Sequence, residues 1–131
     1  MIELDIQLCK NNEIVIYHDL YIGDRFIIDM SYDEIRDLDS SIITLDYFFK
    51  NFDYKNIKIY LDLKGADILA KYLLFFILEK KIVINNIYIA SFNLYHINFF
   101  SNINLGFKLN LGIIYSNNLL DIDLYSMIRQ Y

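Results

Sequence analysis

Apolar and polar residues alternate at the start of the chain. The apolar set is Ile2, Leu4, Ile6 and Leu8, and the polar set between them is Glu3, Asp5, Gln7 and Cys9. Successive side chains of a strand point to opposite faces, so this period of two predicts a strand with Glu3 and Asp5 on one face. Asn11-Asn12 indicates a tight turn, and a second strand over 13–17 then ends at His18-Asp19.

Strands and helices alternate through the second half of the sequence. The pattern predicts strands at 57–64, 87–90 and 109–115 and helices at 67–80, 94–101 and 121–130. This alternation is typical of right-handed β-α-β units, which build parallel sheets. The strand at 57–64 places Asp62 and Lys64 on one face, in the spacing already seen for Glu3 and Asp5.

An irregular excursion is expected between these two halves. A short strand is predicted at 26–28, and the Ser31 and Glu34 pair has the spacing of a capping box that opens a short helix. Thr44 is placed to cap a second short helix over 45–51. Both helices are expected to act as connectors rather than as core elements.

Composition narrows the class of protein. The chain has 131 residues, of which 56% are hydrophobic, and a formal net charge of −5. This length suits one domain with an ample core. An acidic chain lacks the basic stripe that captures phosphate backbones, so we expect no nucleic-acid partner.

The single cysteine and the apolar segments exclude further kinds of protein. Cys9 is the only cysteine, which excludes an internal disulfide, and we expect it to be a small buried side chain. Residues 82–107 lack charged side chains, but seven Asn and His residues interrupt them, so no membrane span is expected there. With no basic flank and apolar signal core at the N-terminus, a cytoplasmic location is expected.

Carboxylates spaced two apart on one strand face suit a hard cation. Mg²⁺ and Ca²⁺ prefer oxygen ligands and negative charge. The alternative for an isolated Glu3 and Asp5 pair is an amphipathic strand whose carboxylates simply face water.

Five blocks of the chain, taken in order, carry a family resemblance. They are I-E-L-D-I-Q-L-C-K-N-N-E-I-V-I-Y-H-D, S-Y-D-E-I-R-D-L-D, I-I-T-L-D-Y-F-F, I-Y-L-D-L-K and I-A-S-F-N. This series resembles the glycerophosphodiester phosphodiesterase family, whose pattern runs E-x-D, then V-V-x-H-D, a helix near E-L, I-P-T-L-E-E, I-E-x-K and S-F. The blocks extend from Glu3 to about Tyr115.

The resemblance implies roles for five residues. Glu3, Asp5 and Asp62 would be metal ligands for Mg²⁺ or Ca²⁺, His18 one of two catalytic histidines, and Lys64 the contact to the substrate phosphate. This fits the chemistry, since phosphodiester hydrolysis needs a cation to neutralise phosphoryl charge and an imidazole to move protons.

Alternatives remain open for these positions and for the second histidine. His18 could be a solvent-exposed loop histidine, and Asp62 and Lys64 could form an ion pair on a solvated strand face. His96 has no motif around it and is expected on a helix surface.

The chain also departs from the family pattern. The family places a His-Arg pair before the E-x-D strand, whereas only Met1 and Ile2 precede Glu3 here. Asp62 is one methylene shorter than the family's glutamate, Ile43 replaces a proline, and Asn11-Asn12 replaces Asp-Gly.

The resemblance implies an α/β fold: a partial TIM-like (β/α) barrel, with an open, mainly parallel sheet and flanking helices. Residues 1–131 would form a single domain that covers roughly the second to fifth barrel units and lacks the first unit and the C-terminal units. Because open sheet edges need cover, we expect an oligomer or a partner.

The residues and the resemblance together leave three functions open. The first is metal-dependent hydrolysis of glycerophosphodiesters in lipid metabolism. The second is a catalytically silent relative that binds a cation or phosphate or serves as an interaction module. The third is an oxygen-ligand cation binder unrelated to lipids.

Overall fold

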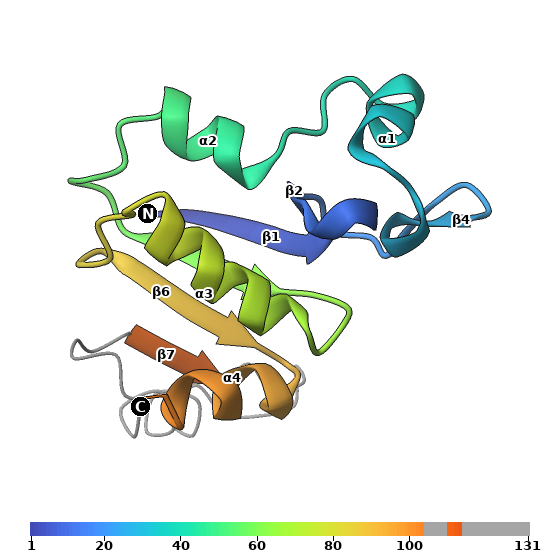
Figure 1. Ribbon diagram of the computed structural model, residues 1–131. Coiled ribbons are helices and arrows are strands. Elements are labelled where there is room, and N and C mark those ends of the chain that lie inside the picture. Colours follow the sequence, from blue (N-terminus) through green and yellow to red (C-terminus); the bar gives the residue numbers. More distant parts are fainter. Residues whose placement is uncertain (104–109, 114–131) are drawn as a thin grey trace.

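Four parallel strands and one antiparallel strand form the central sheet of the computed structural model, which describes residues 1–103 and 110–113 (Figure 1). The strands stand in the order β2-β1-β5-β6-β7. Their bounds are β1 Ile2–Leu8, β2 Ile14–Ile16, β5 Ile59–Leu63, β6 Ile87–Ser91 and β7 Asn110–Ile113. The predicted fold class, an open and mainly parallel sheet with flanking helices, is confirmed.

Helices α2 (Leu45–Asn51), α3 (Leu69–Glu79) and α4 (Leu94–Ser101) flank the sheet (Figure 1). Helix α3 connects β5 to β6 and α4 connects β6 to β7, which gives the predicted β-α-β units. The main core lies between the sheet and these helices, and includes Ile6, Leu61, Leu73 and Ile89, all fully buried. Packing therefore fixes one face of β1 and β5.

The opposite face of β1 and β5 carries the polar residues. Pairing is parallel and in register, with Glu3 opposite Tyr60 and Asp5 opposite Asp62. Because the side-chain period of a strand is two, burying Ile6 and Leu61 against the helices sends Asp5 and Asp62 to the other face. The core thus positions the carboxylates without touching them.

The excursion between β2 and α2 forms a small second unit. It contains a two-stranded ribbon of β3 (Tyr21–Ile22) and β4 (Arg25–Phe26), a 3-10 turn over Ile27–Asp29, and helix α1 (Tyr32–Leu38). The expected strand at 26–28 is wrong in part, because Ile27 turns inward and is fully buried in a second apolar cluster.

Local capping signals predicted the helix starts of the excursion well. Ser31 and Glu34 form the capping box of α1, and the Thr44 hydroxyl accepts from the Tyr47 amide at 3.0 Å to cap α2. Asn11 and Asn12 both adopt positive φ in a 3-10 turn, a conformation that asparagine tolerates better than most residues.

The end of the chain is described only in part. Strand β7 covers the middle of the strand predicted at 109–115, and the helix predicted at 121–130 lies outside the described residues. Within the described ranges, no helix has the length and apolar character needed to cross a membrane.

Candidate functional site

Three carboxylates meet on the polar face of β1 and β5. Ligand oxygens of Glu3, Asp5 and Asp62 all lie within 4.8 Å of one another. Parallel register sets Asp5 beside Asp62, and the spacing of two brings Glu3 to the same face. The structure therefore brings together the three residues that the resemblance marks as metal ligands.

Lys64 lies against this group. Its Nζ is 2.8 Å from Asp62 Oδ2 and 3.6 Å from Asp5 Oδ1, and the side chains of Lys64, Asp5 and Asp62 are 18%, 26% and 6% exposed. Asp62 and Lys64 form an ion pair, as the alternative interpretation of these residues expects. This pair is largely buried, however, and does not lie on a solvated strand face.

One buried carboxylate oxygen is left without a partner. Asp62 Oδ1 accepts no hydrogen bond from any residue that the structure describes. Burial raises the pKa of Asp62, against the opposing effect of the Lys64 ammonium. Buried polar atoms are nearly always satisfied, so this oxygen is the atom of the group that is available to a partner beyond the described residues, such as a cation.

The Lys64 side chain keeps its positive charge beside the carboxylates, despite its burial. Burial acts to lower the pKa of the Lys64 ammonium, but its hydrogen bond to Asp62 and the nearby charge of Asp5 outweigh burial and raise it. Phe92, at the end of β6, lies beside the same ammonium, with Nζ 5.3 Å from the ring centroid. Lys64 is therefore a fixed positive charge at the edge of the carboxylate group.

His18 lies next to the group on an exposed segment that the strands anchor. The Tyr17 amide donates to the Asp5 carbonyl at 2.9 Å, and the Gln7 amide nitrogen donates to the carbonyls of Tyr17 (2.8 Å) and Asp19 (2.7 Å). These three hydrogen bonds tie both sides of His18 to β1.

The His18 ring is tuned by its acidic neighbours. Its Nδ1 lies 2.8 Å from Asp19 Oδ1, and this hydrogen bond, followed by the charge of Asp5, raises the pKa of His18 above 6.5. A raised pKa favours the protonated imidazole, which is the form that donates a proton.

His96 is not the surface residue that the sequence analysis expects. It is fully buried on α4, with Nδ1 2.8 Å from Ser91 Oγ and Nε2 2.8 Å from the Ala66 carbonyl. The missed signal was helical spacing, since Ile97 and Phe100 mark the buried face of α4 and His96 adjoins it. His96 thus joins the end of β6 to the loop that follows Lys64.

Cys9 takes the buried position that the sequence analysis expects. Burial raises the pKa of its thiol to about 11. It is therefore a packing residue and not a nucleophile.

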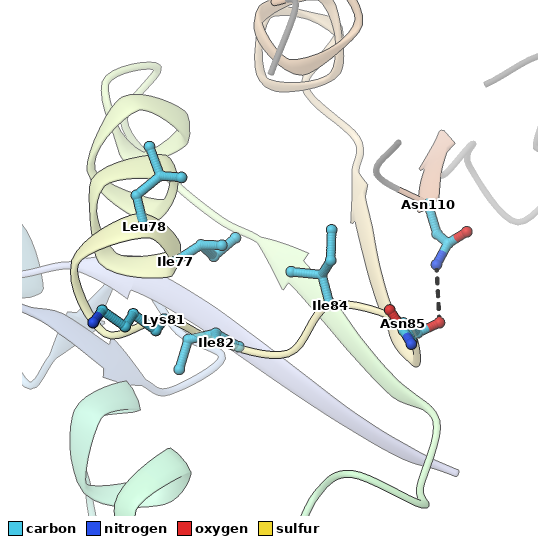
Figure 2. A pocket seen from close by; sticks show the side chains of 7 residues that line it. All are labelled: Ile77, Leu78, Lys81, Ile82, Ile84, Asn85 and Asn110. Atoms are coloured by element: carbon cyan, nitrogen blue, oxygen red, sulfur yellow. Dashed lines mark hydrogen bonds between the residues drawn. The ribbon is translucent and has the colours of Figure 1, made fainter. Parts of the chain in front are cut away.

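A cavity of about 650 Å³ lies away from the carboxylates, at the end of the sheet where β6 and β7 begin. Figure 2 shows its lining, with Ile77 and Ile84 on one side and Asn110 donating to the Asn85 carbonyl on the other. Among the described residues that line this cavity, Lys81 alone is charged. The carboxylate group is therefore the better candidate for a catalytic site, although this cavity is large.

The sequence matches no protein-family model and no curated protein. Solved structures of glycerophosphodiester phosphodiesterases do match. The enzyme from Thermotoga maritima is 25% identical with a TM-score of 0.70, over 94% of this chain and 53% of its own. The enzyme from Parabacteroides distasonis is 25% identical with a TM-score of 0.74, over 96% of this chain and 56% of its own.

The resemblance to the glycerophosphodiester phosphodiesterase family, drawn from the sequence blocks, is confirmed by these structures. A protein from Galdieria sulphuraria assigned to the same class is 21% identical with a TM-score of 0.76 and supports the fold alone. The chain spans about half the length of the structures it matches. Its sheet is accordingly an open part of a (β/α) barrel.

Proposed function

We propose that this chain is a phosphoric diester hydrolase of the glycerophosphodiester phosphodiesterase type, which cleaves glycerophosphodiesters to an alcohol and glycerol phosphate with a divalent cation. The observation that carries the proposal is the carboxylate group itself. Glu3, Asp5 and Asp62 meet within 4.8 Å, Lys64 contacts Asp62 and Asp5, and the charge of Asp5 raises the pKa of His18.

The donor set fits Mg²⁺ or Ca²⁺. All three ligands are carboxylate oxygens, which hard cations prefer, and Asp62 Oδ1 is buried without a partner. Lys64 occupies the other oxygen, Oδ2, and leaves Oδ1 available. A cation held by Glu3, Asp5 and Asp62 would stabilise the charge that develops on the phosphoryl oxygens.

Lys64 and His18 would act on the substrate directly. Lys64 brings a permanent positive charge that attracts a phosphate oxygen and orients the diester. The His18 ring, held by Asp19 through Nδ1, presents Nε2 with a proton that it can give to the leaving alcohol. The hydrogen bond to Asp19 and the charge of Asp5 raise the pKa of the ring and so favour the protonated form that this step needs.

The second candidate is a catalytically silent relative that binds a cation or phosphate. The observation that favours it is the position of His96, the other of two histidines in the sequence, which is buried with both ring nitrogens engaged. His18 is therefore the one histidine available for proton transfer, and loss of one general acid or base typically costs about 10²–10⁴-fold in rate.

Release of glycerol phosphate from glycerophosphocholine separates the two candidates. The full chain is assayed with Mg²⁺ or Ca²⁺ and then with excess EDTA. The enzyme proposal expects turnover that EDTA stops, that His18→Ala lowers by about 10²-fold or more, and that Asp5→Asn abolishes. Asp53→Asn, a change in an exposed aspartate outside the group, is the matched control and should leave turnover unchanged.

The outcomes decide between the candidates. Turnover that His18→Ala leaves intact would make His18 a bystander and overturn the proposed role. No turnover, together with cation binding that Asp5→Asn abolishes, would favour the silent relative. Failure to bind any cation would contradict the enzyme proposal, and failure to bind either a cation or phosphate would contradict both.

A further inference from the structure

The buried ring of His96 connects the end of β6 to the loop after β5. Helix α4, which carries it, begins at the carboxyl end of β6, and β6 is parallel to β5 and β1 (Figure 1). The ring is fully buried, and both of its nitrogens have partners outside α4, the Ser91 hydroxyl and the Ala66 carbonyl, each at 2.8 Å. A buried ring bound at both nitrogens has one orientation, and it restrains its two partners in turn.

The partners of the ring also place its proton. A carbonyl oxygen only accepts hydrogen bonds, so Nε2 carries a proton and donates it to Ala66. The Ser91 hydroxyl lies 2.8 Å from Nδ1 and 3.0 Å from the Leu63 carbonyl, and it accepts from the Asn93 amide. The network therefore reaches the backbone on both sides of Lys64, at Leu63 before it and at Ala66 after it.

The chain leaves the sheet at Lys64. Strand β5 ends one residue earlier, and the Lys64 amide donates to the Ile6 carbonyl at 2.8 Å. The next residue, Gly65, has a φ of +78°, in the left-handed region that glycine enters without steric cost. Because glycine restrains the backbone least, the hydrogen bond from His96 to Ala66 restrains the path of the chain directly after Lys64.

The position of the Lys64 ammonium depends on this path. Its Nζ lies 2.8 Å from Asp62 and 3.6 Å from Asp5, and 5.3 Å from the centroid of the Phe92 ring. Phe92 directly follows Ser91, so the same network holds the backbone next to this ring. Hydrogen bonds weaken steeply as distance and angle depart from the optimum, so a small displacement of this loop would weaken a contact from Lys64 to a phosphate.

We propose that His96 is a positioning residue: by anchoring the Ala66 carbonyl, it holds the Lys64 ammonium where the substrate phosphate binds. The inference rests on the proposed function, in which Lys64 contacts the phosphate, and it adds a residue that acts through another side chain. Both nitrogens of His96 are engaged inside the protein, so it moves no proton in the reaction. Its loss should therefore weaken phosphate binding.

Two substitutions separate the two hydrogen bonds of the ring. In His96→Gln the side-chain amide nitrogen reaches about as far as Nε2 and still donates to Ala66, whereas in His96→Asn the shorter amide reaches only as far as Nδ1. Calorimetric titration of the full chain with glycerol phosphate, in Mg²⁺, measures the affinity. We expect His96→Asn to lower this affinity about three- to tenfold and His96→Gln to keep it within about twofold.

A double-mutant cycle with Lys64→Met shows whether His96 acts through Lys64. Lys64→Met alone should lower the affinity about tenfold or more, because it removes the ammonium. In the Lys64→Met chain, His96→Asn should then lower the affinity by no more than about twofold. The matched control is Ile97→Val, which removes one methylene group from the fully buried neighbour on α4 and breaks no hydrogen bond of the network. It should leave the affinity within about twofold.

A second route into the same cycle guards against misfolding. If urea denaturation shows that His96→Asn folds poorly, Ser91→Ala takes its place, because it removes the hydroxyl that lies between Nδ1 and the Leu63 carbonyl. Its loss of affinity should also disappear in the Lys64→Met chain.

The inference is wrong if His96→Asn leaves the affinity unchanged, if His96→Gln loses as much as His96→Asn, or if Ile97→Val loses as much. A loss that persists in full in the Lys64→Met chain would make His96 a structural residue only. Hydrolysis by the wild type together with any of these results would contradict the positioning role alone. The predicted cycle without any hydrolysis would contradict the proposed function alone, and a wild type that does not bind glycerol phosphate would contradict both.

Discussion

Asp5 and Asp62 stand directly opposite each other in neighbouring parallel strands, and Lys64 Nζ contacts both carboxylates. With Glu3 added, three negative charges face one positive charge, which leaves two net negative charges in one small group. Like charges this close repel unless something compensates them. A divalent cation has the charge that the group lacks.

Lys64→Met should destabilise the fold when divalent cations are absent. The change removes the ammonium that compensates Asp62, and an uncompensated buried carboxylate is costly. Because Lys64 retains some exposure, we expect a loss of about 1–3 kcal/mol in the free energy of unfolding at pH 7 in EDTA. Urea denaturation measures it, and a variant as stable as the wild type would contradict the charge balance described above.

The loss in Lys64→Met should depend on pH with a defined sign. The pKa of Asp62 is already raised above 3.8 in the folded chain, and removal of Lys64 raises it further. A raised folded pKa contributes stability that is present below the unfolded value of 3.8 and is lost as pH rises through the folded value. The gap between variant and wild type should therefore shrink as pH falls toward 4, and a gap that widens would contradict this.

The pKa of His18 should lie above 6.5 and should fall when Asp19 is changed. The hydrogen bond from the ring to Asp19 is the largest cause of the shift, and the charge of Asp5 is the next. NMR titration of the two imidazoles should give a lower pKa for His18 in Asp19→Asn. Addition of Ca²⁺ to the wild type should lower it as well, because a bound cation offsets the charge of Asp5. An unchanged pKa in Asp19→Asn would show that this hydrogen bond does not control the ring.

His96→Ala should destabilise the chain far more than His18→Ala. The buried His96 ring makes two hydrogen bonds, and its removal leaves a cavity and unsatisfied groups at Ser91 and Ala66. We expect a loss of about 2–4 kcal/mol for His96→Ala and within about 0.5 kcal/mol for the exposed His18. Urea denaturation of both variants decides this, and comparable losses would mean that the His96 network contributes little.

Much of the fold could be predicted because local signals agree with the tertiary structure. The alternation of Ile6 and Leu8 with Asp5 and Gln7 has one physical solution, a strand with one face on the core, and β1 takes it. The capping signals at Ser31 and Thr44 act within four residues, so tertiary contacts did not override them.

The errors arose where burial depends on distant contacts. Ile27 lies in a strand-like run, yet it turns into the second core and ends the strand after Phe26. His96 is buried because Ser91 and Ala66, from two other segments, supply its hydrogen bonds. Ser91 lies five residues before His96, but Ala66 lies 30 residues away and cannot be identified from the residues around His96.

The parallel register of β1 and β5 explains why the site residues lie close together. Asp5 and Asp62 lie 57 positions apart in the sequence, and only the pairing of β1 with β5 brings them together. The sequence patterns did not indicate how deeply the Asp62 and Lys64 pair is buried, with side chains 6% and 18% exposed.

Calorimetric titration of the full chain with Ca²⁺ and with Mg²⁺ tests the central claim most directly, because that claim is that the carboxylates of Glu3, Asp5 and Asp62 form a cation site. Glu3, Asp5 and Asp62 should hold one divalent cation per chain, with affinity reduced about 10-fold or more in Asp62→Asn and unchanged in the control Asp53→Asn. Stoichiometric binding that Asp62→Asn weakens is the predicted result. Binding that is absent, or that Asp62→Asn leaves intact, would contradict the account.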